Sequence, residues 1–124
     1  MTKIGWFFVF LSAGLTVLAN LLLRSGVNRA GGFAVDLSAV HGGLLNLIKE
    51  PLFDLGLILY ALASIVWFRV LSTEPLSIAY PVLVSTTFML VTLGAVMVFR
   101  ESLNLYKVIG LVVIFAGIFI ISRS

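Results

Sequence analysis

The sequence of 124 residues contains no cysteine, which excludes disulfide bonds and any metal or redox site built from thiolates. Charged residues make up only 10% of the chain, whereas soluble domains contain about 25%, and 61% of the residues are hydrophobic. So little charge cannot cover so much apolar surface in water. We therefore expect an integral membrane protein, and we interpret the net charge of +3 as basic loops beside anionic lipid rather than a nucleic-acid surface.

Acidic residues are missing from the middle of every long apolar run. All the carboxylates lie in loops or near the ends of the runs: Asp36, Glu50, Asp54, Glu74 and Glu101. A proton-coupled exporter of cations normally needs a buried carboxylate that holds the proton and the substrate in turn. The sequence also lacks a phosphate-binding glycine loop, a hydrolytic triad and a metal-ligand cluster. We expect a protein that is not an enzyme and that has neither a cofactor nor a metal.

Four apolar runs of about twenty residues are each long enough to cross a bilayer as a helix. We expect an all-α membrane protein with spans at residues 4–23, 51–70, 75–99 and 103–122, in one domain that covers residues 1–124. Apolar residues at helical spacing in the long first loop predict a short interfacial helix at 36–49. Gly110 and Gly117 permit close helix approach on the last span, either within one protomer or in a dimer, which we favour.

Polar residues recur at every fourth position of the first run: Ser12, Thr16, Asn20 and Arg24. Residues four apart share one face of a helix, so these side chains form a stripe. The hydroxyls could simply bond the carbonyl one turn back. An amide followed by an arginine, whose planar fork of donors matches phosphate, instead indicates a site for an anionic head group.

The second and third runs supply candidates for a wall that faces this stripe. The second run carries Tyr60, Ser64 and Trp67 on one face, and the third carries Tyr80 and Ser85. Aromatic residues at the membrane interface and ordinary hydrogen bonds between helices are the alternative explanations. Pro81 frees a carbonyl one turn back, which predicts a kink where the third span can bend between states.

Two segments, "PLSIAYPVLVSTTF" and "RESLNLYKVIGLVVIFAGIFIIS", resemble the small multidrug resistance group of the drug/metabolite transporter (EamA-like) superfamily. The matching points are "IAY", Glu101, Gly110 and Gly117. The drug exporters of that group carry a first-helix glutamate, and Thr16 falls at or near its position here. Ser85 and Thr87 replace glycines associated with bending. Proton-coupled efflux of cations is therefore not what these residues predict.

The chain more closely resembles the flippase subunits for aminoarabinose-phosphoundecaprenol, which also lack that glutamate. The shared features are the Asn20–Arg24 spacing, the long first loop and the aromatic residues of "VWFRVLS". The resemblance implies a bacterial inner-membrane carrier for a polyprenyl-phosphate-linked sugar, with Asn20, Arg24, Tyr80 and Glu101 at matching positions. It also implies a paired protein, either a homodimer in parallel or antiparallel arrangement or a heterodimer with a related chain. The alternatives are a small exporter of cationic drugs or metabolites and an accessory subunit of a larger membrane protein.

Overall fold

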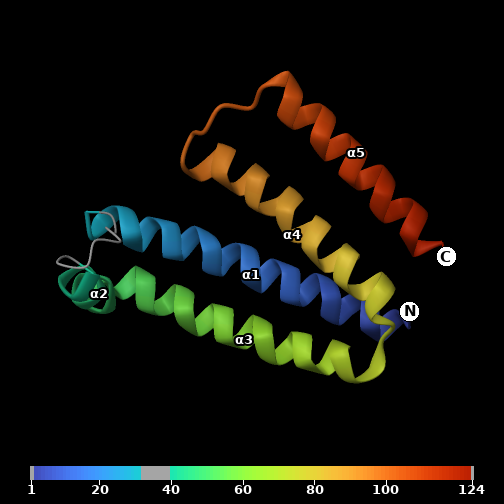
Figure 1. Ribbon diagram of the computed structural model, residues 1–124, viewed down its shortest axis with the longest axis horizontal. Coiled ribbons are helices and arrows are strands. Elements are labelled where there is room, and N and C mark those ends of the chain that lie inside the picture. Colours follow the sequence, from blue (N-terminus) through green and yellow to red (C-terminus); the bar gives the residue numbers. More distant parts are fainter. Residues whose placement is uncertain (1, 32–39, 124) are drawn as a thin grey trace.

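A computed structural model describes residues 2–31 and 40–123, which are almost entirely helical (Figure 1). Within these two ranges, four helices are long and apolar enough to cross a membrane: α1 (Lys3–Arg29), α3 (Pro51–Thr73), α4 (Leu76–Val98) and α5 (Leu105–Ser122). A shorter helix, α2 (Val40–Lys49), lies between α1 and α3 in the chain. The predicted all-α class with four spans is confirmed.

The helix bounds differ from the expected spans mainly at the end of α1. This helix continues past Leu23 to Arg29, so Arg24 lies more than a turn before its end. Helix α2 falls within the expected range of 36–49, of which residues 36–39 lie outside the described part of the chain. Its position at a membrane interface remains a prediction. Helix α4 runs without a break through Pro81, and bending at that residue during transport also remains a prediction.

Helix α1 lies between α3 and α4, and α5 lies outside α4 (Figure 1). The closest approach joins α1 and α3 because two glycines remove side chains from their contact. A Cβ atom added at Gly26 would lie 2.6 Å from the backbone nitrogen of Phe53, and one added at Gly56 would lie 2.9 Å from Cγ of Leu23. Small residues let backbones pack this closely in a membrane, where packing rather than hydrophobic burial drives helix association.

A small core near the start of α1 joins α1, α3 and α4. Its buried members are Val9, Val70, Ala79 and Val82. At the same end, the carboxylate of Glu74 in the α3–α4 turn accepts hydrogen bonds from the Thr2 hydroxyl at 2.6 Å and from the Thr2 backbone N–H at 3.1 Å. These bonds lower the pKa of Glu74 below its ordinary value of 4.5. The turn is thereby fastened to the residue that caps α1.

Helix α5 packs mainly against α4. None of its residues is buried. Several of its large side chains, including Ile120 and Phe115, are more than half exposed. Apolar side chains exposed in this way are solvated by lipid or covered by another membrane chain. Because the number of spans is even, both termini lie at one end of the molecule (Figure 1).

Candidate functional site

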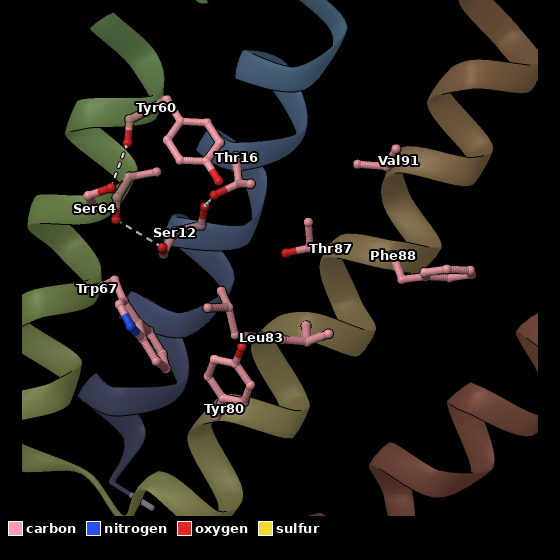
Figure 2. Close-up of a pocket in the computed structure, with 12 residues that line it drawn as sticks. Ser12, Thr16, Tyr60, Ser64, Trp67, Tyr80, Leu83, Thr87, Phe88 and Val91 are labelled. Carbon is pink, nitrogen blue, oxygen red and sulfur yellow. Dashed lines mark hydrogen bonds between the residues drawn. The ribbon is translucent and has the colours of Figure 1, made fainter. Parts of the chain in front are cut away.

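A pocket of about 420 Å³ lies between α1, α3 and α4 (Figure 2). The residues that line it are all uncharged and combine hydroxyl groups, aromatic rings and aliphatic side chains: Ser12, Thr16, Tyr60, Ala63, Ser64, Trp67, Tyr80, Leu83, Val84, Thr87, Phe88 and Val91. Six of the nine predicted substrate-binding residues are among them. Across the described residues, no group of three His, Cys, Asp or Glu side chains is placed to hold a metal.

The stripe on α1 forms a ladder of hydrogen bonds. Ser12 is buried, and its hydroxyl donates to the carbonyl of Ala63 on α3 at 3.0 Å. Thr16 donates to the carbonyl of Ser12 at 2.8 Å, and the Asn20 amide donates to the carbonyl of Thr16 at 2.9 Å. Ser12 therefore fastens α1 to α3, while Thr16 and Asn20 bond locally. The Thr16 hydroxyl oxygen and the Asn20 carbonyl oxygen keep the capacity to accept a hydrogen bond.

Aromatic rings from α3 and α4 form the opposite wall. The ring centroids of Trp67 and Tyr80 lie 6.1 Å apart, with their planes inclined by 53°. The side chains of Tyr60 and Tyr80 are about half exposed, so their rings are available to a ligand. Ser64 donates its hydroxyl to the carbonyl of Tyr60 at 3.0 Å (Figure 2). Flat rings of this kind stack on apolar faces and attract cations.

Thr87 is a pocket residue that the sequence did not identify as part of the site. Its hydroxyl oxygen is buried and has no hydrogen-bond partner within the part of the chain that the structure describes. Figure 2 shows the hydroxyl directed toward the space bounded by α1 and α3. By contrast, Thr92 on the same helix donates to the carbonyl of Phe88 one turn back. The spacing from Tyr80 to Thr87, two helical turns, was the signal that could have placed Thr87 on the pocket face.

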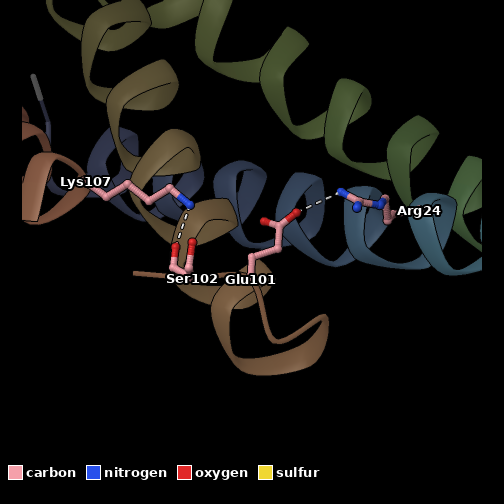
Figure 3. Close-up of polar contacts among 4 residues, drawn as sticks. All are labelled: Arg24, Glu101, Ser102 and Lys107. Atoms are coloured by element: carbon pink, nitrogen blue, oxygen red, sulfur yellow. Dashed lines mark hydrogen bonds and ion pairs between the residues drawn. The ribbon is translucent and has the colours of Figure 1, made fainter. Parts of the chain in front are cut away.

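Three predicted site residues do not line this pocket: Asn20, Arg24 and Ser85. Ser85 is half-buried elsewhere on α4. Arg24 forms an ion pair with Glu101, with Nη1 and Oε1 3.2 Å apart, and its guanidinium carbon lies 5.1 Å from the ring centroid of Phe99 (Figure 3).

The single stripe predicted on α1 is thus divided between two places. Because a helix rises about 1.5 Å per residue, Arg24 lies roughly 12 Å along α1 from Thr16. The hydroxyl-lined pocket and the arginine are therefore separate positions on one face of α1. Glu101, expected at a structural position before the last span, is the residue that holds the arginine.

The two glycines predicted to permit helix approach lie on the outer helix. Apart from its chain neighbours and the nearby backbone of α5, a Cβ atom added at Gly110 or Gly117 would meet no described atom within 4 Å. Their neighbourhood within the protomer is therefore open, and packing inside one chain does not explain them. A role in dimerisation remains a prediction.

No family model matches the chain, and no solved structure matches it. Several curated bacterial proteins do. The "Probable 4-amino-4-deoxy-L-arabinose-phosphoundecaprenol flippase subunit ArnF" of Proteus mirabilis is 33% identical over 126 residues, covering 98% of this chain and 94% of the relative. The ArnF subunit of Serratia proteamaculans is 33% identical over 89% of this chain and 85% of the relative. The ArnE subunit of Erwinia tasmaniensis is 43% identical over 51% of this chain and 57% of the relative.

Four helices able to span a membrane, three of which enclose an uncharged pocket, define a small multi-pass membrane protein of the transporter class. It is a protein of the bacterial inner membrane, as the sequence predicted. The chain belongs to the family of 4-amino-4-deoxy-L-arabinose-phosphoundecaprenol flippase subunits, which are small multidrug resistance-like members of the drug/metabolite transporter superfamily.

Proposed function

We propose that this chain is one subunit of a flippase that moves a polyprenyl-phosphate-linked aminosugar across the inner membrane. The sugar head occupies the pocket between α1, α3 and α4, and the polyprenyl tail stays in the surrounding lipid. The observation that carries the proposal is the pocket's composition: hydroxyls and aromatic rings with no charge, inside a membrane protein. The names of the relatives describe a substrate with an amine, sugar hydroxyls, a phosphate and such a tail.

The pocket offers a complementary group for each part of an aminosugar. Its volume of about 420 Å³ falls within the usual range of small-molecule sites. The rings of Tyr60, Trp67 and Tyr80 stack on the apolar face of a sugar, and they attract a protonated amine through cation–π interactions. The hydroxyls of Thr16 and Thr87 supply hydrogen bonds to the sugar hydroxyls. A carboxylate is not required for this recognition.

The phosphate of the carrier lipid binds first at Arg24 in this proposal. The Arg24–Glu101 pair is exposed, with 54% and 38% of the two side chains accessible, so the pair is weak and a phosphate can replace Glu101. Guanidinium binds phosphate through two parallel hydrogen bonds. A sugar bonded directly to the phosphate is shorter than the roughly 12 Å between Arg24 and Thr16. The head group therefore occupies the arginine and the pocket in succession, with Asn20 between them.

The subunit partner binds through α5 in this proposal. Within α5, which the structure describes in full, no residue is buried, and Gly117 leaves open space for a second helix. Gly110, the other glycine predicted to permit helix approach, lines a second cavity beside α4. The relatives carry two subunit names, which supports a pair of related chains. A homodimer, in parallel or antiparallel arrangement, uses the same surface.

The second candidate function is export of lipophilic cations, because the same aromatic rings attract them. The uncharged lining argues against it. Exchange of a cation for a proton needs a group that binds both in turn, and the twelve residues around the pocket do not include a carboxylate.

Thermal unfolding of the purified protein tests the proposal. The ligands are undecaprenyl phosphate with and without the aminosugar, and tetraphenylphosphonium. A ligand at a hundred times its Kd stabilises the folded state by about 2.7 kcal/mol, which raises the midpoint of unfolding. We expect the aminosugar lipid to stabilise the protein most. Trp67→Leu should abolish the advantage given by the sugar, while Trp6→Leu is the matched control because Trp6 packs against the core.

The outcomes separate the candidates. Stabilisation by tetraphenylphosphonium alone would replace the flippase with the exporter. Equal stabilisation by undecaprenyl phosphate with and without the sugar would show that the pocket does not hold the head group.

A further inference from the structure

A second cavity, of about 380 Å³, lies between α4 and α5 near the start of α5. We call it the α4–α5 groove. One charged residue lines it together with neutral and apolar ones: Phe88, Thr92, Asn104, Tyr106, Lys107, Gly110, Leu111 and Ile114. The groove shares only Phe88 with the uncharged pocket, which lies on another face of α4. Its charge and position therefore distinguish it from the proposed sugar site.

Lys107 holds its ammonium in a fixed place at one end of the groove. The side chain is half-buried, and Nζ donates to the backbone carbonyl of Ser102 at 2.6 Å (Figure 3). An ammonium has three donors, so two remain for a ligand. Asn104 adds a further donor, because its side-chain oxygen accepts from the Lys107 backbone N–H at 2.9 Å and its NH₂ group is left over.

The rest of the groove is apolar and open. Phe88, Leu111 and Ile114 form its walls, and the Thr92 hydroxyl is already bonded to the carbonyl of Phe88. At Gly110 no described atom lies within 4 Å of the position that a Cβ would take, so this residue leaves the floor unfilled. Because no residue of α5 is buried, the groove is open at the surface of the single chain. It thus has the form of a site for an amphiphile, with a cation at one end and an apolar channel at the other.

We propose that the α4–α5 groove binds an anionic phospholipid of the bilayer. The lipid phosphate sits at Lys107 and Asn104, and an acyl chain lies along Gly110. Charge complementarity identifies this occupant, because Lys107 is the charged residue among those that line the groove and lies in the first turn of a spanning helix, at the depth of the head groups. The proposal does not depend on which substrate the uncharged pocket takes.

Native mass spectrometry of the purified full chain with added dioleoylphosphatidylglycerol tests this site. We expect Lys107→Gln to weaken phosphatidylglycerol binding roughly tenfold, as loss of a charge-assisted hydrogen bond does. Lys107→Arg should retain binding. Lys3→Gln is the matched control, since it removes the same charge from the first turn of α1 at the other end of the molecule. Gly110→Leu should fill the channel and reduce binding without changing the charge, and the same spectra report whether it alters the oligomeric state.

Five results would overturn the proposal. Wild-type affinity in Lys107→Gln, or an equal loss in Lys3→Gln, would show that the groove has no special anion site. Displacement of the phospholipid by millimolar inorganic phosphate would show that only an anion is bound. Preferential binding of undecaprenyl phosphate through Lys107 would assign the groove to the substrate. If Lys107→Gln fails to fold, Gly110→Leu carries the test alone, and unchanged binding in it contradicts the acyl channel.

Discussion

Replacing Glu101 by glutamine should tighten the binding of a phosphorylated carrier lipid. In the structure this carboxylate forms an ion pair with the guanidinium of Arg24, with Nη1 and Oε1 3.2 Å apart. If Arg24 binds the lipid phosphate, Glu101 is its competitor. Removing the charge while keeping the shape of the side chain frees the arginine for the ligand.

The size of the effect follows from the exposure of the pair. Both side chains are more than a third accessible, at 54% and 38%, so solvent screens their attraction strongly. Exposed pairs contribute at most about 1 kcal/mol. The variant should therefore lower the free energy of unfolding by less than about 1 kcal/mol. It should tighten phosphate binding by up to about fivefold, the affinity ratio that corresponds to 1 kcal/mol.

Titration of purified protein with undecaprenyl phosphate, followed by tryptophan fluorescence, measures this change. Arg24→Gln should weaken binding by about tenfold or more, because a charge-assisted hydrogen bond to phosphate is lost. Arg29→Gln is the matched control. Arg29 lies on the same helix and also pairs with a glutamate, Glu50, at 3.4 Å, but the proposal gives it no role in binding.

The reasoning would be refuted if Glu101→Gln weakened binding as much as Arg24→Gln does. Glu101 would then support the site rather than compete for it. Equal effects of Arg24→Gln and Arg29→Gln would indicate general attraction to basic residues at this end of the molecule.

Three further predictions concern stability, measured by unfolding in detergent. Gly26→Ala should destabilise the protein by about 1–3 kcal/mol, because the new methyl meets a backbone on α3, whereas Gly14→Ala, with no described atom within 4 Å of its Cβ, should be neutral or stabilising. Ser12→Ala should remove about 0.6 kcal/mol by breaking a bond between helices, and Ser64→Ala, which breaks a local one, should have a smaller effect. Because the pKa of Glu74 is lowered on folding, this carboxylate stabilises the folded state above the ordinary value of 4.5, and the stabilisation is lost as the pH falls through the folded pKa. The unfolding midpoint of Glu74→Gln should therefore fall less on acidification than that of the wild type.

The spans could be predicted from the sequence because a helix needs about twenty apolar residues to cross the hydrocarbon core of a bilayer. The stripe on α1 was also predictable, since Ser12 and Thr16 stand at helical spacing among apolar residues and both reach the pocket. The end of α1 was not, because hydropathy falls at Arg24 while the helix continues to Arg29. A charge near the water marks the edge of the lipid, not the end of the hydrogen-bonded backbone.

The face of α4 could not be predicted because its hydroxyl-bearing and apolar residues are spread over all sides of the helix. An amphipathic pattern identifies the packed side of a helix, and a helix surrounded by lipid and other helices needs none. The sequence therefore predicts Ser85 as a pocket residue, whereas Thr87 lines the pocket. These two positions are about 200° apart around the helix. The Arg24–Glu101 pair joins residues far apart in sequence, and only the resemblance to related chains placed both at important positions.

Helices α1, α3 and α4 supply every described residue that lines the uncharged pocket. Helix α5 supplies none of these lining residues. If the pocket selects the cargo and α5 binds the partner chain, as proposed above, the two properties lie in separate segments of the sequence. Mutations in residues 105–122 should then change which chain assembles with this one while the cargo stays the same, and mutations at the pocket residues of α1, α3 and α4 should change the cargo without altering assembly. Duplicated copies of such a gene could diverge in one property at a time, a route by which a self-pairing ancestor gives rise to two distinct subunits.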